Sequence, residues 1–183
     1  GAHFYQIIDQ ANIPLIFLNN ITGYMVGTEY EQAGMIKHGS QMIQAAANIR
    51  VPKLTFYVGA SYGAGNYGMA GYGYDPDFLF AWPGAMTGVM SGESAAGTME
   101  TVALNSAKRR GVEPDMEALA KQRAAIEKVF SSQEDAFFTS GRLLDHGVVD
   151  PRDTRKILGF TLETIWERKH RTLNPNAFGI GRM

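Results

Sequence analysis

The stretch Val51-Pro-Lys-Leu-Thr-Phe-Tyr-Val58, followed by Gly59-Ala-Ser-Tyr-Gly63-Ala-Gly65-Asn-Tyr-Gly68-Met69, decides how the fold is read. Its first half is rich in β-branched and aromatic residues, and its second half in glycine, which is the pattern of a strand, a tight turn and a helix start. The first turn of a helix has N–H groups without internal partners and carries the positive end of the helix dipole. The sequence therefore predicts a turn that binds negative charge, of the oxyanion-hole type.

Two other motifs overlap this turn. Gly59-Ala-Ser61-Tyr-Gly63 fits the G-x-S-x-G nucleophile elbow, and Gly63-Ala-Gly65-Asn-Tyr-Gly68 fits the G-x-G-x-x-G dinucleotide fingerprint. The fingerprint requires an acidic residue at the end of the next strand, whereas the segment 77–83 ends in Ala-Trp-Pro. The dinucleotide interpretation therefore fails. A glycine turn that only lets helix and strand pack closely stays open as an alternative.

A serine hydrolase built on Ser61 is the main competing enzyme class. Asp145, His146 and Asp150 offer an acid and a histidine in the chain order that the elbow motif requires. Asp145 and His146 are adjacent in sequence, however, and 183 residues are short for the sheet of an α/β-hydrolase. The serine hydrolase stays open as an alternative here, and the strand-to-turn geometry together with the family resemblance given below predicts instead that Ser61 is not a nucleophile.

Composition indicates one globular domain with a substantial core, at 183 residues, 45% hydrophobic and 19% charged. The net charge of -1 provides no electrostatic attraction toward nucleic acid or an anionic membrane. Cysteine is absent, which excludes disulfides and thiolate metal sites, and the four histidines lack ligand spacing, so no metal is expected. The first residues, Gly1-Ala-His-Phe-Tyr5, resemble the middle of a helix, so we expect half of a longer subunit.

The order of elements predicts a β-α-β unit near the start of the chain. We expect a helix over 3–11, a buried strand over 13–18, a loop over 19–28, a helix over 29–49 and a strand over 51–58. The loops that follow both strands then lie at the same sheet edge, where ligands of such sheets bind. Further along we expect a strand over 78–82, a helix to about 108, an exposed helical excursion over 105–133, a helix from 137, a last helix from 153 and an extended tail from 174.

Blocks of sequence spread over the whole chain carry a resemblance to a known family. They are Asn20–Glu31, Gly34–Gly39, Val51–Lys53, Ser61–Met69, Ala81–Pro83, Val89–Met90 with Glu93–Gly97, Gly147–Arg155 and Phe178–Met183. Together they resemble the carboxyl-terminal half of the carboxyltransferase subunit of biotin-dependent acyl-CoA carboxylases. The sequences of these blocks are most similar to those of the methylcrotonyl-CoA and geranyl-CoA carboxylase branch.

The resemblance implies an α/β fold, the crotonase-like ββα superhelix, with residues 1–183 as one carboxyl-terminal carboxyltransferase domain. In such enzymes an amino-terminal half holds the CoA thioester, and the carboxyl-terminal half of another subunit holds biotin. The implied partners are therefore an acyl-CoA, a biotin carboxyl carrier or biotin carboxylase subunit, the amino-terminal half and further copies of the subunit. The implied compartment is the bacterial cytoplasm or the mitochondrial matrix, and nucleic acid or membrane partners are not expected.

The same resemblance implies roles for residues of the glycine turn. Ala64 and Gly65 correspond to the biotin-side oxyanion hole, whose N–H groups would stabilise the ureido oxygen of biotin as carboxybiotin releases carbon dioxide. Tyr67 corresponds to a position that faces the acyl end of the substrate. The other residues implied in biotin or substrate binding are Gly63, Tyr24 and Gly27. Biotin, carried on a partner protein, is the implied cofactor, and the chain alone is expected to be inactive. A non-catalytic oligomerisation module of the same fold is a further alternative.

Overall fold

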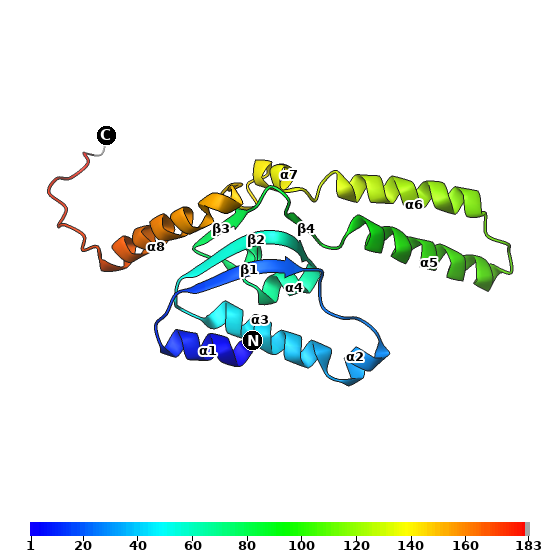
Figure 1. Cartoon of the computed structure of the whole chain (residues 1–183), viewed down its shortest axis with the longest axis horizontal. Helices are drawn as coiled ribbons and strands as arrows, with labels where there is room; N and C mark the ends of the chain where they lie inside the picture. Colours follow the sequence, from blue (N-terminus) through cyan, green and yellow to red (C-terminus); the bar gives the residue numbers. More distant parts are fainter. Residues whose placement is uncertain (182–183) are drawn as a thin grey trace.

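The computed structural model describes residues 1–181 and is built on one sheet. Strands β1 (Leu15–Ile21), β2 (Lys53–Tyr62) and β3 (Phe78–Ala81) lie in the order β1-β2-β3, and β4 (Met86–Gly88) pairs with the last part of β2. The pairings of β2 with β1, β3 and β4 are all parallel. The loops that follow the strands therefore emerge at one edge of the sheet, as the sequence predicts (Figure 1).

One face of the sheet is covered by helices from the first part of the chain. These are α1 (Ala2–Gln10), α3 (Met35–Asn48) and the short α4 (Gly63–Gly68), with α2 (Thr28–Gln32) before α3. Tyr5 of α1, Phe17 of β1 and Ala46 of α3 are buried together in a single core cluster. The β1-α3-β2 crossover is the β-α-β unit expected from the sequence.

The opposite face is covered by α8 (Thr154–His170). Because side chains alternate along a strand, Leu54 and Phe56 of β2 point to this face and pack with Phe80 and Ile165. A 3-10 turn, Pro151–Asp153, leads into α8, and another, Tyr72–Tyr74, precedes β3. The segment 146–149 lies along β3, with the Val149 N–H donating to the Ala81 carbonyl at 2.8 Å.

Helices α5 (Gly92–Arg110) and α6 (Met116–Ser131) form a hairpin that projects from the sheet, and α7 (Ala136–Gly141) brings the chain back (Figure 1). Both long helices have side-chain N-caps, because Ser91 accepts from the Ser94 N–H and Asp115 from the Ala118 N–H. Gly111 ends α5 in the left-handed conformation with φ 65°. The exposed helical excursion predicted over 105–133 is thus confirmed.

Some predicted boundaries of helices and strands are wrong. The helix expected over 29–49 is two helices, because the chain breaks at Gly34, whose φ is 88°. Strand β2 does not turn at Gly59 but continues to Tyr62, because its last residues pair with β4, which the sequence did not reveal. Residues 171–181 form no helix or strand. Within residues 1–181, no helix is both long and apolar enough to cross a membrane.

Candidate active site

The predicted anion-binding turn lies where β2 passes into α4, at the carboxyl edge of the sheet. Gly63 has φ 58°, the left-handed conformation that glycine adopts without strain, and α4 begins there. The N-cap residue Tyr62 gives no side-chain hydrogen bond to the helix start. Since Ala64 and Gly65 belong to the first helical turn, their N–H groups have no acceptor within the helix. The structure therefore places Ala64 and Gly65 in the first turn of α4, and their role as a donor pair stays a prediction.

The two donor residues differ in their surroundings. Ala64 is exposed and Gly65 is buried. A Cβ on Gly65 would lie 2.7 Å from Cδ1 of Ile21 and 3.2 Å from the Cα of Gly23. The first of these distances is shorter than Cβ contacts in real proteins. Gly65 does not have a positive φ. A side chain at position 65 would therefore be tight against Ile21 of β1 and Gly23 of the loop after β1, whereas glycine at position 63 is favoured by the backbone torsion.

Ser61 lies beneath this turn and is fully buried. Its Oγ accepts a hydrogen bond from the Asn66 Nδ2 at 2.9 Å, and the Asn19 Nδ2 lies at 3.4 Å. The Asn66 Nδ2 also donates to the Tyr57 Oη at 2.9 Å, and burial raises the pKa of Tyr57. The serine of the G-x-S-x-G motif is thus enclosed in a polar cluster, where a substrate cannot reach it.

The residues that would complete a hydrolase triad are occupied elsewhere. The Nδ1 of His146 accepts from the Leu79 N–H at 2.9 Å, and the Asp145 carboxylate accepts from the Gly147 N–H at 2.9 Å. Asp150 caps the turn before α8 and pairs with an arginine. Within residues 1–181, no hydrogen bond joins any of the three to Ser61. The structure therefore does not assemble the triad.

The far end of α4 is fastened by three side chains. The carbonyl groups of residues 68, 69 and 70 accept, in order, from the Tyr5 Oη at 2.9 Å, the Asn19 Nδ2 at 3.3 Å and the Thr55 Oγ1 at 2.7 Å. These donors come from α1, β1 and β2. The carbonyl groups of residues 68 and 69 belong to the end of α4, which leaves them without internal partners, and that of residue 70 follows directly after it. Helix α4 is therefore held to the body of the domain from three elements.

The remaining predicted site residues lie around α4 in different roles. The Tyr24 ring fills the space beside Gly39 and Gly68, its Oη donates to the Gly39 carbonyl at 3.4 Å, and burial raises its pKa. Gly27 precedes α2 with φ 128° and is exposed. Tyr67 is 46% exposed, and its ring centroid is 5.2 Å from that of Tyr74. Sequence reasoning gave no role to Asn66, although it lies inside the quoted motif.

Residues 1–179 match the family model described as the carboxyl transferase domain. This chain belongs to the carboxyl transferase domain family. It is 51% identical over 183 residues to a probable biotin-dependent acyl-coenzyme A carboxylase beta2 subunit of Mycobacterium tuberculosis, covering 100% of this chain and 34% of that protein. It is 42% identical over 186 residues to the mitochondrial methylcrotonoyl-CoA carboxylase beta chain of Arabidopsis thaliana, covering 100% of this chain and 31% of that protein.

Solved structures agree with this family. The geranyl-CoA carboxylase beta subunit of Pseudomonas aeruginosa superposes with a TM-score of 0.87 at 47% identity, over 100% of this chain and 34% of that one. A transcarboxylase 12S structure gives a TM-score of 0.74 at 28% identity, over 98% of this chain and 32% of that one. The carboxyl transferase domain therefore has the α/β crotonase-like fold, as the sequence resemblance implies. The chain spans about a third of the length of these relatives.

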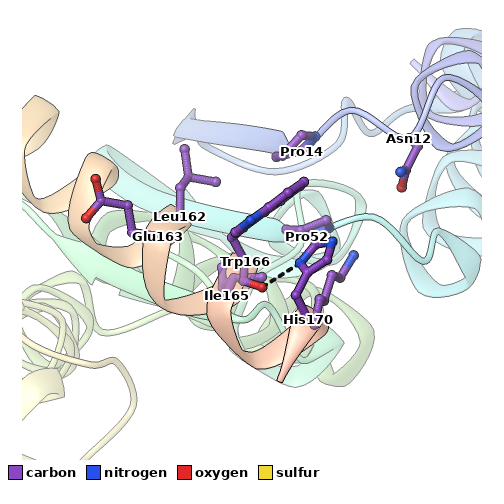
Figure 2. A pocket seen from close by; sticks show the side chains of 9 residues that line it. Asn12, Pro14, Pro52, Leu162, Glu163, Ile165, Trp166 and His170 are labelled. Atoms are coloured by element: carbon purple, nitrogen blue, oxygen red, sulfur yellow. Dashed lines mark hydrogen bonds between the residues drawn. The ribbon is translucent and has the colours of Figure 1, made fainter. Parts of the chain in front are cut away.

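A large groove of this carboxyl transferase domain lies away from the turn. It has a volume of about 690 Å³ and lies between α8 and the amino ends of β1 and β2, where Pro14, Pro52, Trp166 and His170 line it (Figure 2). The His170 Nδ1 donates to the Trp166 carbonyl at 2.8 Å. Because α4 follows the carboxyl end of β2, the length of the strands separates this groove from the candidate site. In the described part of the chain, no group of three or more His, Asp or Glu side chains is placed to hold a metal.

Proposed function

We propose that this chain supplies the biotin-side part of the carboxyltransferase site in a biotin-dependent acyl-CoA carboxylase, which moves a carboxyl group from carboxybiotin to an acyl-CoA. The observation that carries the proposal is the pair of first-turn N–H groups of Ala64 and Gly65, at the carboxyl edge of the sheet in a chain of the carboxyl transferase family. Methylcrotonoyl-CoA and geranyl-CoA appear in the names of relatives, and branched acyl-CoA thioesters are the substrates we propose first.

The chemistry of the donor set fits biotin. The ureido oxygen of biotin gains negative charge when the carboxyl group leaves, and this is the chemistry that the cofactor supplies. In the proposed site, the N–H groups of Ala64 and Gly65 donate to that oxygen, and the amino end of α4 adds its positive dipole. Both donors are fixed before the reaction, because the Asn66 side chain ties the first turn of α4 to β2. A fixed donor of this kind is worth about 2.7 to 4 kcal/mol of transition-state stabilisation.

The neighbouring residues have supporting roles in the proposal. Tyr67 is exposed beside the donor pair and contacts the acyl chain. Gly63 and Gly27 have no side chain, so that biotin can approach the backbone. Tyr24 takes part through its packing against Gly39 and Gly68, which holds the loop after β1 close to α4.

The complete enzyme needs components beyond this chain. We propose that residues 1–183 form one domain of a longer subunit, that another part of that subunit binds the CoA thioester, and that a partner protein carries biotin. The transcarboxylase 12S protein assembles as a hexamer, and a homo-oligomer is proposed here as well. The chain alone is then inactive. Relatives come from a bacterium and from mitochondria, so the bacterial cytoplasm or the mitochondrial matrix is the proposed compartment.

The test is carboxylation by the complete subunit with its biotin-carrying partner, ATP and radiolabelled bicarbonate. We expect acyl-CoA-dependent incorporation of label, with a branched unsaturated acyl-CoA preferred. Absence of transfer to any acyl-CoA would favour the non-catalytic oligomerisation module. A fluorophosphonate added to the same protein is expected to leave Ser61 unmodified, because that side chain is fully buried. Stoichiometric labelling of Ser61 would favour the serine hydrolase instead.

A further inference from the structure

Helix α4 is too short to be stable, or to keep a fixed orientation, without contacts to the rest of the domain. It has six residues, and helices of fewer than about 12 residues are marginal in water without tertiary contacts. The direction of its first-turn N–H groups therefore depends on what fastens the helix to the sheet. The hydrogen bonds from Tyr5, Asn19 and Thr55 act on the carbonyl groups of residues 68–70, at the end of α4 away from those N–H groups.

A single polar side chain is available to fasten the first turn. The first four residues of α4 are Gly63, Ala64, Gly65 and Asn66, and only the last has a polar side chain. Its Nδ2 donates to the Tyr57 Oη and to the Ser61 Oγ, each at 2.9 Å. The two N–H bonds of that amide group are thus both used on acceptors of one strand, β2.

The surroundings are shaped to receive this amide. Tyr57 is 3% exposed and Ser61 is fully buried, so both acceptors are shielded from water. A Cβ on Gly71 would lie 1.7 Å from the Asn66 Oδ1, so only glycine at that position leaves room for the side chain. The Gly71 N–H donates to the backbone carbonyl of Asn66 at 2.9 Å. Asn66 is therefore held by its main chain and by its side chain.

We infer that Asn66 is a positioning residue for carboxyl transfer, which sets the direction of the Ala64 and Gly65 N–H groups by tying the first turn of α4 to β2. The inference rests on the proposed function. Gly65 is joined to Asn66 by one planar peptide unit, so a displacement of Asn66 is passed directly to the donor pair. The inference also accounts for the buried Ser61, which serves as an acceptor for Asn66 and not as a nucleophile.

Asn66→Ala in the complete enzyme removes both hydrogen bonds to β2. We expect kcat for carboxyl transfer to fall roughly tenfold to a hundredfold, the effect of misplacing catalytic donors, while KM for the acyl-CoA stays within about twofold. Tyr5→Phe is the matched control, because it removes one buried hydrogen bond of 2.9 Å from the other end of α4. The control is expected to lower Tm and to keep kcat. Equal losses of kcat in the two variants, or a parental kcat in Asn66→Ala, would overturn the inference.

Asn66→Asp tests whether the Asn66 side chain lies beside the charge that forms in the reaction, and it does so even if the alanine variant does not fold. The hydroxyl groups of Tyr57 and Ser61 can turn to donate to a carboxylate, so the tether is kept, while a negative charge now lies next to the donor pair. We expect a Tm near that of the parent and a lower kcat, because that charge opposes the negative charge that forms in the reaction. A parental kcat for Asn66→Asp would mean that no negative charge forms beside Asn66, and the oxyanion assignment on which the inference rests would fail.

A variant that removes the Ala64 N–H separates this inference from the proposed function. If that variant transfers carboxyl groups at the parental rate, the oxyanion assignment fails, and the inference fails with it. If that variant is inactive and Asn66→Ala has the parental kcat, only the role of Asn66 is wrong.

Discussion

Gly65→Ala tests whether the glycine at the centre of the site is needed for space. The added Cβ would meet Cδ1 of Ile21 at 2.7 Å and Cγ1 at 3.0 Å, and the Cα of Gly23 at 3.2 Å. Overpacking of this kind costs about 1 to 3 kcal/mol. For a chain of 183 residues each kcal/mol shifts Tm by about 2 to 4 °C, so Tm should fall by roughly 2 to 12 °C. The N–H of residue 65 is retained in this variant.

Two companion variants separate steric overlap from backbone strain. Ile21→Val removes the Cδ1 atom nearest to the added Cβ, so the double variant Gly65→Ala with Ile21→Val should regain most of the lost Tm. Gly63→Ala instead places a Cβ on a left-handed residue, at a cost of about 1 to 2 kcal/mol that Ile21→Val cannot recover. Thermal unfolding followed by circular dichroism measures the parent, the three single variants and the two double variants with Ile21→Val. An unchanged Tm in Gly65→Ala, or rescue of Gly63→Ala by Ile21→Val, would refute the packing argument.

Three further outcomes are expected. Tyr67→Val in the complete enzyme should change the ranking of acyl-CoA substrates by kcat/KM with little change in Tm, because the side chain is 46% exposed; an unchanged ranking would remove Tyr67 from the acyl site. Hydrogen bonds from the Arg50 and Val51 N–H groups, and the Arg50 guanidinium, lower the pKa of Asp9. The contribution of the Asp9 carboxylate to stability is therefore present above a pH of about 4 and is lost as the pH falls through the lowered pKa of the folded state. Asp9→Asn should therefore lower Tm at neutral pH, with a gap to the parent that closes in acid; a gap that is the same at both pH values would contradict this. The isolated chain should self-associate in sedimentation experiments, because apolar side chains such as Leu18 and Trp166 are 57% and 67% exposed; it should not carboxylate any acyl-CoA, and a monomer that does so would contradict both expectations.

Local patterns in the sequence were enough to predict the centre of the fold. The apolar runs before Asn19 and before Gly59 gave the two parallel strands, and the glycines from Gly63 onward gave the turn into a helix. The boundary at the end of β2 could not be predicted, because it depends on pairing with β4 more than 20 residues later in the chain. Strand pairing between distant segments leaves little trace in either segment alone.

The backbone of the candidate site could be predicted from the sequence, but the side chains that hold this backbone in place could not. The first-turn donors follow from the glycine pattern, because the N–H groups of any helix start lack partners. The role proposed for Asn66 depends on Tyr57 and Ser61 both accepting from its side-chain amide, which only the folded chain shows. Asn66 lies inside the glycine motif, and a polar side chain among the glycines was the one available signal. The tight contact of Gly65 with Ile21 is likewise visible only in the folded chain.

Removal of the Ala64 N–H tests the central claim most directly. Proline at position 65 would add ring atoms where even a Cβ meets Ile21, whereas Ala64 is exposed. Lactic acid in place of Ala64 in the complete enzyme exchanges the N–H for an ester oxygen and keeps the methyl group. A matching ester at Glu93, in the first turn of α5, is the control. The account predicts that transfer from carboxybiotin falls roughly a hundredfold to a thousandfold in the Ala64 ester at an unchanged Tm, with the Glu93 ester as active as the parent. Parental transfer by a folded Ala64 ester would contradict it.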